Sequence, residues 1–197
     1  ILVGFSGLYE RKDGVLSGLW ERHKVDSIAG DWDYVEPVLF ATAAGMVIER
    51  WWEEFLAPFH RRAVVQAHEW MTGAALLYLQ DRIPGIGTVF TTHATMLGRA
   101  LASLGISPDP NAGDKGLGGK TPDELARIHG VQAKHSIEGV CARKADVFTT
   151  VSAITAAEAE LLHHRKVDPL LPNGIDLDVV DQLVAGDRPA MRRELER

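Results

Sequence analysis

The chain has 197 residues, of which 46% are hydrophobic and 24% charged, the composition of an ordinary globular protein with one good-sized core. Its net charge of −6 and isoelectric point near 5.7 argue against a surface for nucleic acid or anionic membrane, since both need clustered Lys and Arg. No apolar run reaches the ~20 residues of a membrane span, so we expect neither nucleic acid nor membrane as a partner.

The amino-terminal half predicts a strand, a long helix, a second strand and a second helix. Residues 1–5 are typical of a strand or the end of one. The apolar residues of 31–56 recur close to a 3.6 period, which indicates a helix from about residue 33, with Pro37 tolerable only near its start. The run 63–68 is typical of a strand, and a helix is predicted from about 71 to 82.

The carboxyl-terminal half repeats this alternation. A strand is predicted over 86–93, followed by a helix that ends at Gly105, and another strand over 146–150. Thr155 and Glu158 have the spacing of a capping box for a helix that runs through His163.

Between these elements, the segment 121–145 begins with a strong helix start signal. Thr121 suits the cap position, Pro122 the first helical position and Glu124 the third. Strands that alternate with helices predict an α/β fold, a Rossmann-like parallel sheet flanked by helices, and we expect helices on both faces.

Three of the predicted strands end in polar residues. These residues are His68 and Glu69, then Thr91, Thr92 and His93, then Thr149, Thr150 and Ser152. Open parallel sheets bind ligands at the carboxyl ends of their strands, so together these side chains predict a site at one rim of the sheet. For Ser152 taken alone, the favoured alternative is that it caps the helix that follows it.

The middle strand end favours an anionic ligand. Free backbone amides are expected where a helix starts near Thr95, and Arg99 in its first turns supplies a fixed positive charge for phosphate oxygens. The alternative is that Arg99 is a solvated helix residue.

Other kinds of site find less support in the sequence. Residues 114–121 nearly match a phosphate-binding P-loop, but Asp114 replaces its first glycine and no strand precedes it. His163 and His164 are adjacent, so on a helix they point apart, and neither a metalloprotease nor a paired-cysteine spacing is present. We therefore expect no metal. Cys141 shares a predicted helix face with apolar residues, which indicates a core thiol.

Four stretches resemble, in order and spacing, the eukaryotic-type glycogen synthases of glycosyltransferase family three. They are "AHEWMTGAAL" from residue 67, "VFTTHATMLGR" from 89, "ADVFTTVSAITAAEAELL" from 145 and "LPNGID" from 171. The resemblance implies the amino-terminal lobe of a GT-B enzyme that transfers glucose, with retention, from UDP-glucose or ADP-glucose to an α-1,4-glucan acceptor, without metal or cofactor.

The resemblance also implies roles for individual residues. His93 would be the catalytic residue and would contact the donor glucose, and Arg99 would assist donor binding. His68, Glu69, Thr92, Ser152 and Asn173 would line the same cleft. Residues 1–172 would form a partial amino-terminal domain, and 173–197 the linker and the start of the following segment, with the second domain absent.

Two hypotheses of function follow from this resemblance. The chain begins at Ile1 without Met and stops inside a helical-looking segment, so we expect a fragment of a glucosyltransferase that is inactive alone. The alternative is a stand-alone, non-catalytic module that binds glucan or sugar nucleotide. A single cysteine fits a reducing cytosol, so a cytoplasmic location is expected. A homo-oligomer is compatible with either hypothesis.

Overall fold

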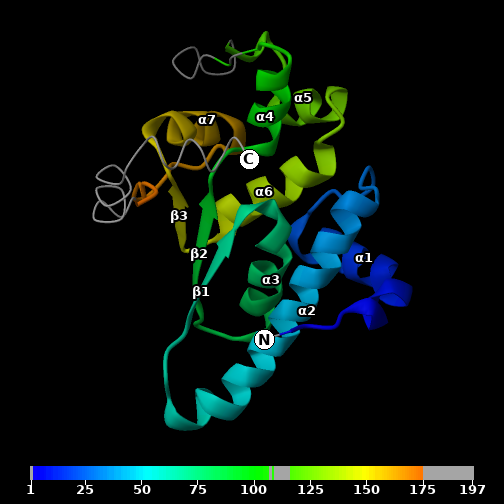
Figure 1. The fold of residues 1–197 in the computed structure, drawn as a ribbon, viewed down its shortest axis with the longest axis vertical. Coiled ribbons are helices and arrows are strands. Elements are labelled where there is room, and N and C mark those ends of the chain that lie inside the picture. Colours follow the sequence, from blue (N-terminus) through cyan, green and yellow to red (C-terminus); the bar gives the residue numbers. More distant parts are fainter. Residues whose placement is uncertain (1, 107, 109–115, 175–197) are drawn as a thin grey trace, which may run out of the picture.

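The computed structural model describes residues 2–106, 108 and 116–174 (Figure 1). In chain order the elements are the 3₁₀ helix η1 (Ser6–Arg11), α1 (Lys12–His23), α2 (Trp32–Phe55), the 3₁₀ helix η2 (Ala57–Phe59), β1 (Val64–His68), α3 (Glu69–Arg82), β2 (Gly87–Thr92), α4 (Met96–Ser103), α5 (Pro122–Ile128), α6 (Gln132–Lys144), β3 (Val147–Thr150) and α7 (Ala153–His163). Among these residues no helix is both long enough and apolar enough to cross a bilayer.

The three strands form a parallel sheet in the order β1-β2-β3. Ala67 pairs with Phe90, and Phe90 with Phe148, so one row of side chains crosses all three strands on the same face. The predicted parallel sheet flanked by helices is therefore confirmed, with its strands within two residues of their expected bounds.

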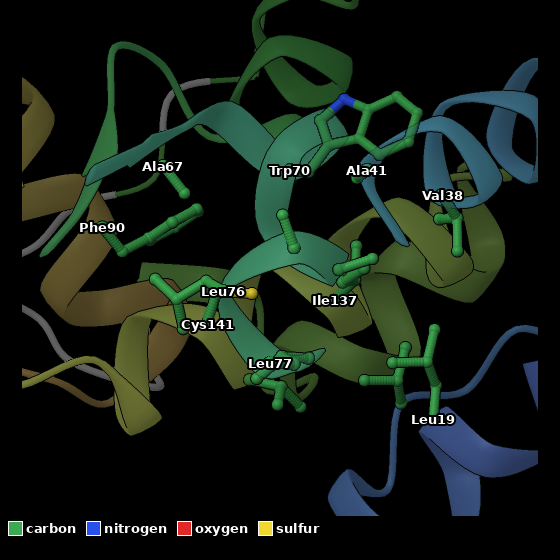
Figure 2. Packing of buried hydrophobic residues seen from close by; sticks show 14 of the residues in the cluster. Leu19, Val38, Ala41, Ala67, Trp70, Leu76, Leu77, Phe90, Ile137 and Cys141 are labelled. Carbon is green, nitrogen blue, oxygen red and sulfur yellow. The ribbon is translucent and has the colours of Figure 1, made fainter. Parts of the chain in front are cut away.

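One face of the sheet carries the core. Phe90 and Phe148 are fully buried and stack with ring centroids 6.1 Å apart. Helices α3 and α6 cover them, contributing residues such as Leu76, Ile137 and Cys141 to one buried cluster (Figure 2). Complete burial stabilises the fold by roughly 1.5–3 kcal/mol for each large apolar side chain. Cys141 is a core thiol as predicted, and burial raises its pKa.

The expectation that helices cover both faces is wrong for α3 and α6, which both lie on the Phe90 face. On the opposite face the edge strand β1 exposes Val64, Gln66 and His68, Val64 by 69%, whereas Thr91 of β2 and Thr149 of β3 are buried. The reason is topological: the strands are added in one direction, from β1 to β2 to β3. Right-handed crossovers then place α3 and α6 on the same face. Helices on the second face would require the strand order to reverse.

Helix α2 packs outside α3 and forms a further layer on the same side of the sheet (Figure 1). Val38 and Ala41 point from α2 toward the cluster that Leu77 joins from α3 (Figure 2). Pro37 lies in the second turn of α2, where it removes one backbone hydrogen bond, to the carbonyl of Asp33, and the 24-residue helix continues past it.

Three local predictions were wrong. Residues 2–5 form no strand and lead into η1. The segment 121–145 forms two helices, because Gly130 turns the chain with a φ of +70° between α5 and α6. Helix α7 is capped by the Ser152 side chain, which accepts from the Thr155 amide, so Thr155 is not the cap. By contrast, the capping box of Thr121 that opens α5 is confirmed.

Candidate functional site

The strand ends meet as predicted. In the register of the sheet His68 lies beside Thr91, Thr91 beside Thr149, and Thr92 beside Thr150. The carboxyl ends of all three strands therefore form one edge, which we call the carboxyl edge.

Two histidines and a glutamate come together at the carboxyl edge. His68 Nδ1 lies 3.1 Å from His93 Nε2, and the two rings are 5.4 Å apart with a tilt of 32°. The Glu69 carboxylate accepts a 2.8 Å hydrogen bond from the backbone N–H of His93. His68 is exposed, and His93 and Glu69 are half-buried, so a ligand can reach this group from solvent. We call these three residues the edge cluster.

The backbone of Glu69 is strained. Its φ is +63°, a left-handed conformation that costs a residue with a side chain roughly 1–2 kcal/mol. Glu69 is the first residue of α3, directly after β1, so the chain turns from strand to helix without an intervening loop. Thr72 supports this turn by donating a 2.6 Å hydrogen bond to the carbonyl oxygen of His68. Backbone strain of this kind is typical of functional sites.

Hydrogen bonds of buried threonine hydroxyl groups stabilise the carboxyl edge. Thr91 and Thr149 are buried and share a 2.7 Å hydrogen bond between neighbouring strands, and Gln66 donates to Thr91 over 3.0 Å. These contacts fix the strand ends that carry His68 and His93.

At the start of α4, two of the amides expected to bind an anion are occupied by the protein's own side chains. Glu138 accepts a 3.0 Å hydrogen bond from the Met96 amide, and Thr95 accepts one from the Gly98 amide. Thr95 in turn donates to Glu158 over 2.6 Å. Arg99 is exposed one turn into the helix, so its charge faces solvent, while the Met96 and Gly98 amides are paired within the protein.

The remaining predicted site residues are placed differently. Thr92, expected in the cleft, is fully buried and donates inward to Glu138 over 3.2 Å. Ser152 is half-buried and serves as the cap of α7, and Asn173 is exposed. The rest of the expected linker, 175–197, and the segment 109–115 lie outside the described residues.

Sequence reasoning missed a second group of histidines. His135, Glu138 and His163 offer ligand atoms that all lie within 4.8 Å of one another, and all three residues are buried. Burial lowers the pKa of His135, although the nearby Asp123 carboxylate acts in the opposite direction. The signal available in the sequence was the three-residue spacing of His135 and Glu138, which places both on one helix face.

Comparison with known proteins places the chain in a family. The family profile described as glycogen synthase matches residues 1–184. The glycogen (starch) synthase of Neurospora crassa is 36% identical over 160 residues, which cover 81% of this chain and 21% of that protein. Isoform 2 of the glycogen (starch) synthase of Saccharomyces cerevisiae is 44% identical over 114 residues, which cover 58% of this chain and 16% of that protein. The liver glycogen (starch) synthase of Mus musculus is 40% identical over 117 residues, which cover 59% of this chain and 16% of that protein.

The chain thus spans about a fifth, or less, of the length of these relatives. Residues 67–99, which include the edge cluster, and residues 145–163, which include β3 and α7, fall inside the matched range. Together the matched range and the level of identity establish that the chain belongs to the glycogen synthase family.

Proposed function

We propose that the protein containing this chain is a retaining glucosyltransferase, which moves glucose from a nucleotide-glucose donor to the non-reducing end of an α-1,4-glucan. The observation that supports this proposal is the edge cluster, in which His68, Glu69 and His93 meet at the carboxyl edge of a parallel sheet. Sheets of this kind bind ligands at that edge, and the chain is a member of the glycogen synthase family.

In this proposal His93 contacts the donor glucose. Its backbone is held on one side by β2 and its amide by Glu69, so the ring has a defined position. Because Nε2 of His93 faces His68, Nδ1 is the atom that reaches the sugar. His68 acts as a positioning residue, since the bond between the two rings determines which nitrogen of His93 carries the proton.

Arg99 binds the diphosphate of the donor. Its guanidinium is always charged and has the planar fork that suits phosphate oxygens. The amides at the start of α4 are used by Glu138 and Thr95, so the positive charge on this helix comes from the Arg99 side chain rather than from the helix terminus. Ser152 and Asn173 line the same cleft.

The proposal extends to the whole protein. Residues 1–172 form part of the amino-terminal domain of a GT-B enzyme, and 173–197 lead toward a second domain that completes the cleft. Retaining transfer needs positive charge on the leaving diphosphate and a site that excludes water, and the second domain supplies both. The transfer itself uses no metal or cofactor, and the protein works in the cytoplasm.

The test is a glucan-extension assay with the full-length protein. Purified enzyme is incubated with glycogen and either UDP-glucose or ADP-glucose, with and without a chelator, and incorporated glucose and its linkage are measured. We expect incorporation in α-1,4 linkage from at least one donor, unaffected by the chelator at low temperature. Binding of glycogen or donor without any incorporation would reject the enzyme and favour a binding module.

A further inference from the structure

Helices α6 and α7 enclose a group of potential metal ligands. His135 and Glu138 lie three residues apart on α6, and His163 is the last residue of α7. Their ligand atoms lie within 4.8 Å of one another, and the side chains of Glu138 and His163 are 0% exposed. His163 Nε2 is 3.1 Å from Glu138 Oε2. Two donor atoms at this separation, each ~2.0 Å from a zinc ion, subtend an angle of about 100° at the metal, close to the tetrahedral value.

Both imidazoles retain an unused nitrogen. His135 Nδ1 and His163 Nδ1 are buried, and neither has a hydrogen-bond partner among the described residues. The rings stack with centroids 5.1 Å apart. Buried polar atoms are nearly always paired, so the unpaired Nδ1 of His135 indicates a missing partner, whereas His163 would bind the same partner through Nε2, the atom beside Glu138. A cation that accepts nitrogen lone pairs would supply it.

The surrounding contacts are those of a supported metal site. Glu138 is fixed by hydrogen bonds from the Thr92 hydroxyl and the Met96 amide. His135 Nε2 lies 3.5 Å from the Asp123 carboxylate, which leaves Nδ1 of His135 for a metal. Metal-binding histidines usually donate their second nitrogen to a carboxylate in this way, which orients the ring and strengthens the ligand.

A cavity of about 610 Å³ borders the group. Its lining includes His135, Asp123 and Gly139 but neither Glu138 nor His163, so an ion entering from this cavity would first meet His135. Arg143 also lines this cavity and donates to the backbone oxygen of His163 over 3.2 Å, so its charge opposes a dication. Lys24 and Arg127 line the cavity as well, and the carboxylates of Asp26, Asp123 and Glu138 offset these three positive charges.

We propose that His135, Glu138 and His163 bind a zinc ion, with a water molecule from the cavity as the fourth ligand. Two imidazoles and one carboxylate suit Zn²⁺ better than Mg²⁺ or Ca²⁺, which prefer oxygen ligands. The ion joins α6 to α7. It also stabilises the start of α4, because Glu138 accepts from the Met96 amide there. Its role is structural, and it is independent of the proposed sugar transfer.

The test measures metal binding directly in the full-length protein. Chelator-treated protein is titrated with Zn²⁺ by calorimetry and with Co²⁺ by visible absorption, and thermal unfolding is followed with and without Zn²⁺. We expect binding that requires the cluster and a rise in the unfolding midpoint when Zn²⁺ is added. His135→Gln and His163→Gln each keep a donor for the neighbouring carboxylate while removing an imidazole ligand.

Each variant should weaken Zn²⁺ binding by more than about 100-fold, since losing a partner of a ligand alone costs 10- to 100-fold. The control is His60→Asn, at an exposed histidine outside the cluster, which should bind Zn²⁺ like the unmodified protein. Circular dichroism without metal verifies that the variants fold, and His135→Gln at the cavity wall remains informative if His163→Gln does not. Absence of Zn²⁺ binding, or unchanged affinity in His135→Gln, would overturn the proposal. Neither result bears on the glucan-extension assay.

Discussion

The protein contains two histidine pairs with the same chemical groups in opposite surroundings. His68 and His93 meet beside Glu69 at the carboxyl edge, where His68 is exposed. His135 and His163 stack beside Glu138 in the interior, where the Glu138 carboxylate is inaccessible to solvent. We call the first the edge pair and the second the buried pair.

Burial decides which kind of ligand each histidine pair can bind. At the edge, water satisfies any unused nitrogen, so a polar ligand can replace that water at little cost. In the interior, an unpaired nitrogen cannot form a hydrogen bond to water, so it needs a partner within the protein or a bound ion. The edge pair is thus suited to transient substrates and the buried pair to a resident ligand.

The largest effect is expected from His93→Ala in the full-length protein. If the ring binds the donor sugar more strongly in the transition state than in the ground state, turnover should fall about 30- to 1000-fold, equal to about 2–4 kcal/mol. The KM for the donor should change less. Steady-state kinetics with varied donor measures both, with His60→Asn as the unaffected control. Near-normal constants in His93→Ala would make the edge pair purely structural.

Substitutions of Arg99 test whether the edge pair acts together with a positive charge. Arg99→Ala should raise the KM for the nucleotide-glucose about 10- to 100-fold and also slow turnover, because a charge-assisted contact is worth about 1.5–3 kcal/mol. Arg99→Lys should restore only part of the loss, since Lys lacks the planar fork. The same kinetic assay decides it, and a donor KM that both variants leave unchanged would mean that Arg99 is simply solvated.

Matched Glu→Gln substitutions compare the two pairs in stability. Glu138→Gln should lower the free energy of unfolding by about 1–3 kcal/mol, because its buried hydrogen-bond donors lose a charged acceptor. Glu69→Gln, at the half-buried edge, should change it by no more than about 0.5 kcal/mol. Urea unfolding in the presence of a chelator measures both without a metal contribution. Equal losses would show that burial is not what separates the pairs.

The smallest effect concerns His23, a buried histidine outside both pairs. Its Nε2 is 3.0 Å from Asp81 and its Nδ1 2.9 Å from Lys144. Burial lowers its pKa below the ordinary 6.5, with Lys144 and Arg22 acting in the same direction and Asp81 against them. The unfolded chain therefore binds a proton more readily, so the stability from neutral His23 is complete above about pH 6.5 and is lost as the pH falls.

His23→Gln should accordingly make the free energy of unfolding less dependent on pH in the acidic range. Urea unfolding at neutral and mildly acidic pH measures this dependence, and His60→Asn should keep the slope of the unmodified protein. An unchanged slope in His23→Gln would mean that other groups carry the acid sensitivity.

Much of the fold could be predicted because its signals are local. The runs at 63–68 and 86–93 have the composition of buried strands, and Thr121 with Glu124 marks a helix start, as the structure confirms. The meeting of His68 and His93 could also be predicted from the sequence. Once two strands are parallel and adjacent, residues that follow them must meet at one edge.

The remaining features depend on long-range packing. The placement of α3 and α6 on the same face follows from the order of the strands in space, which no local pattern reports. Glu138 is 25 residues from His163, and their contact depends on how α6 and α7 pack together. Thr92 illustrates the same limit, because whether a residue at a strand end faces solvent or Glu138 is decided by α6.

The left-handed backbone conformation of Glu69 lowers the stability of the fold, while the Glu69 side chain positions His93. Glycine there would relieve the roughly 1–2 kcal/mol of strain, yet it would remove the carboxylate that holds the His93 amide. Selection of variants for heat resistance alone would therefore favour a substitution that loosens the edge pair. A thermostabilised form of this protein is expected to need Glu69 held fixed during selection, with the gain sought in the core beneath Phe90 instead.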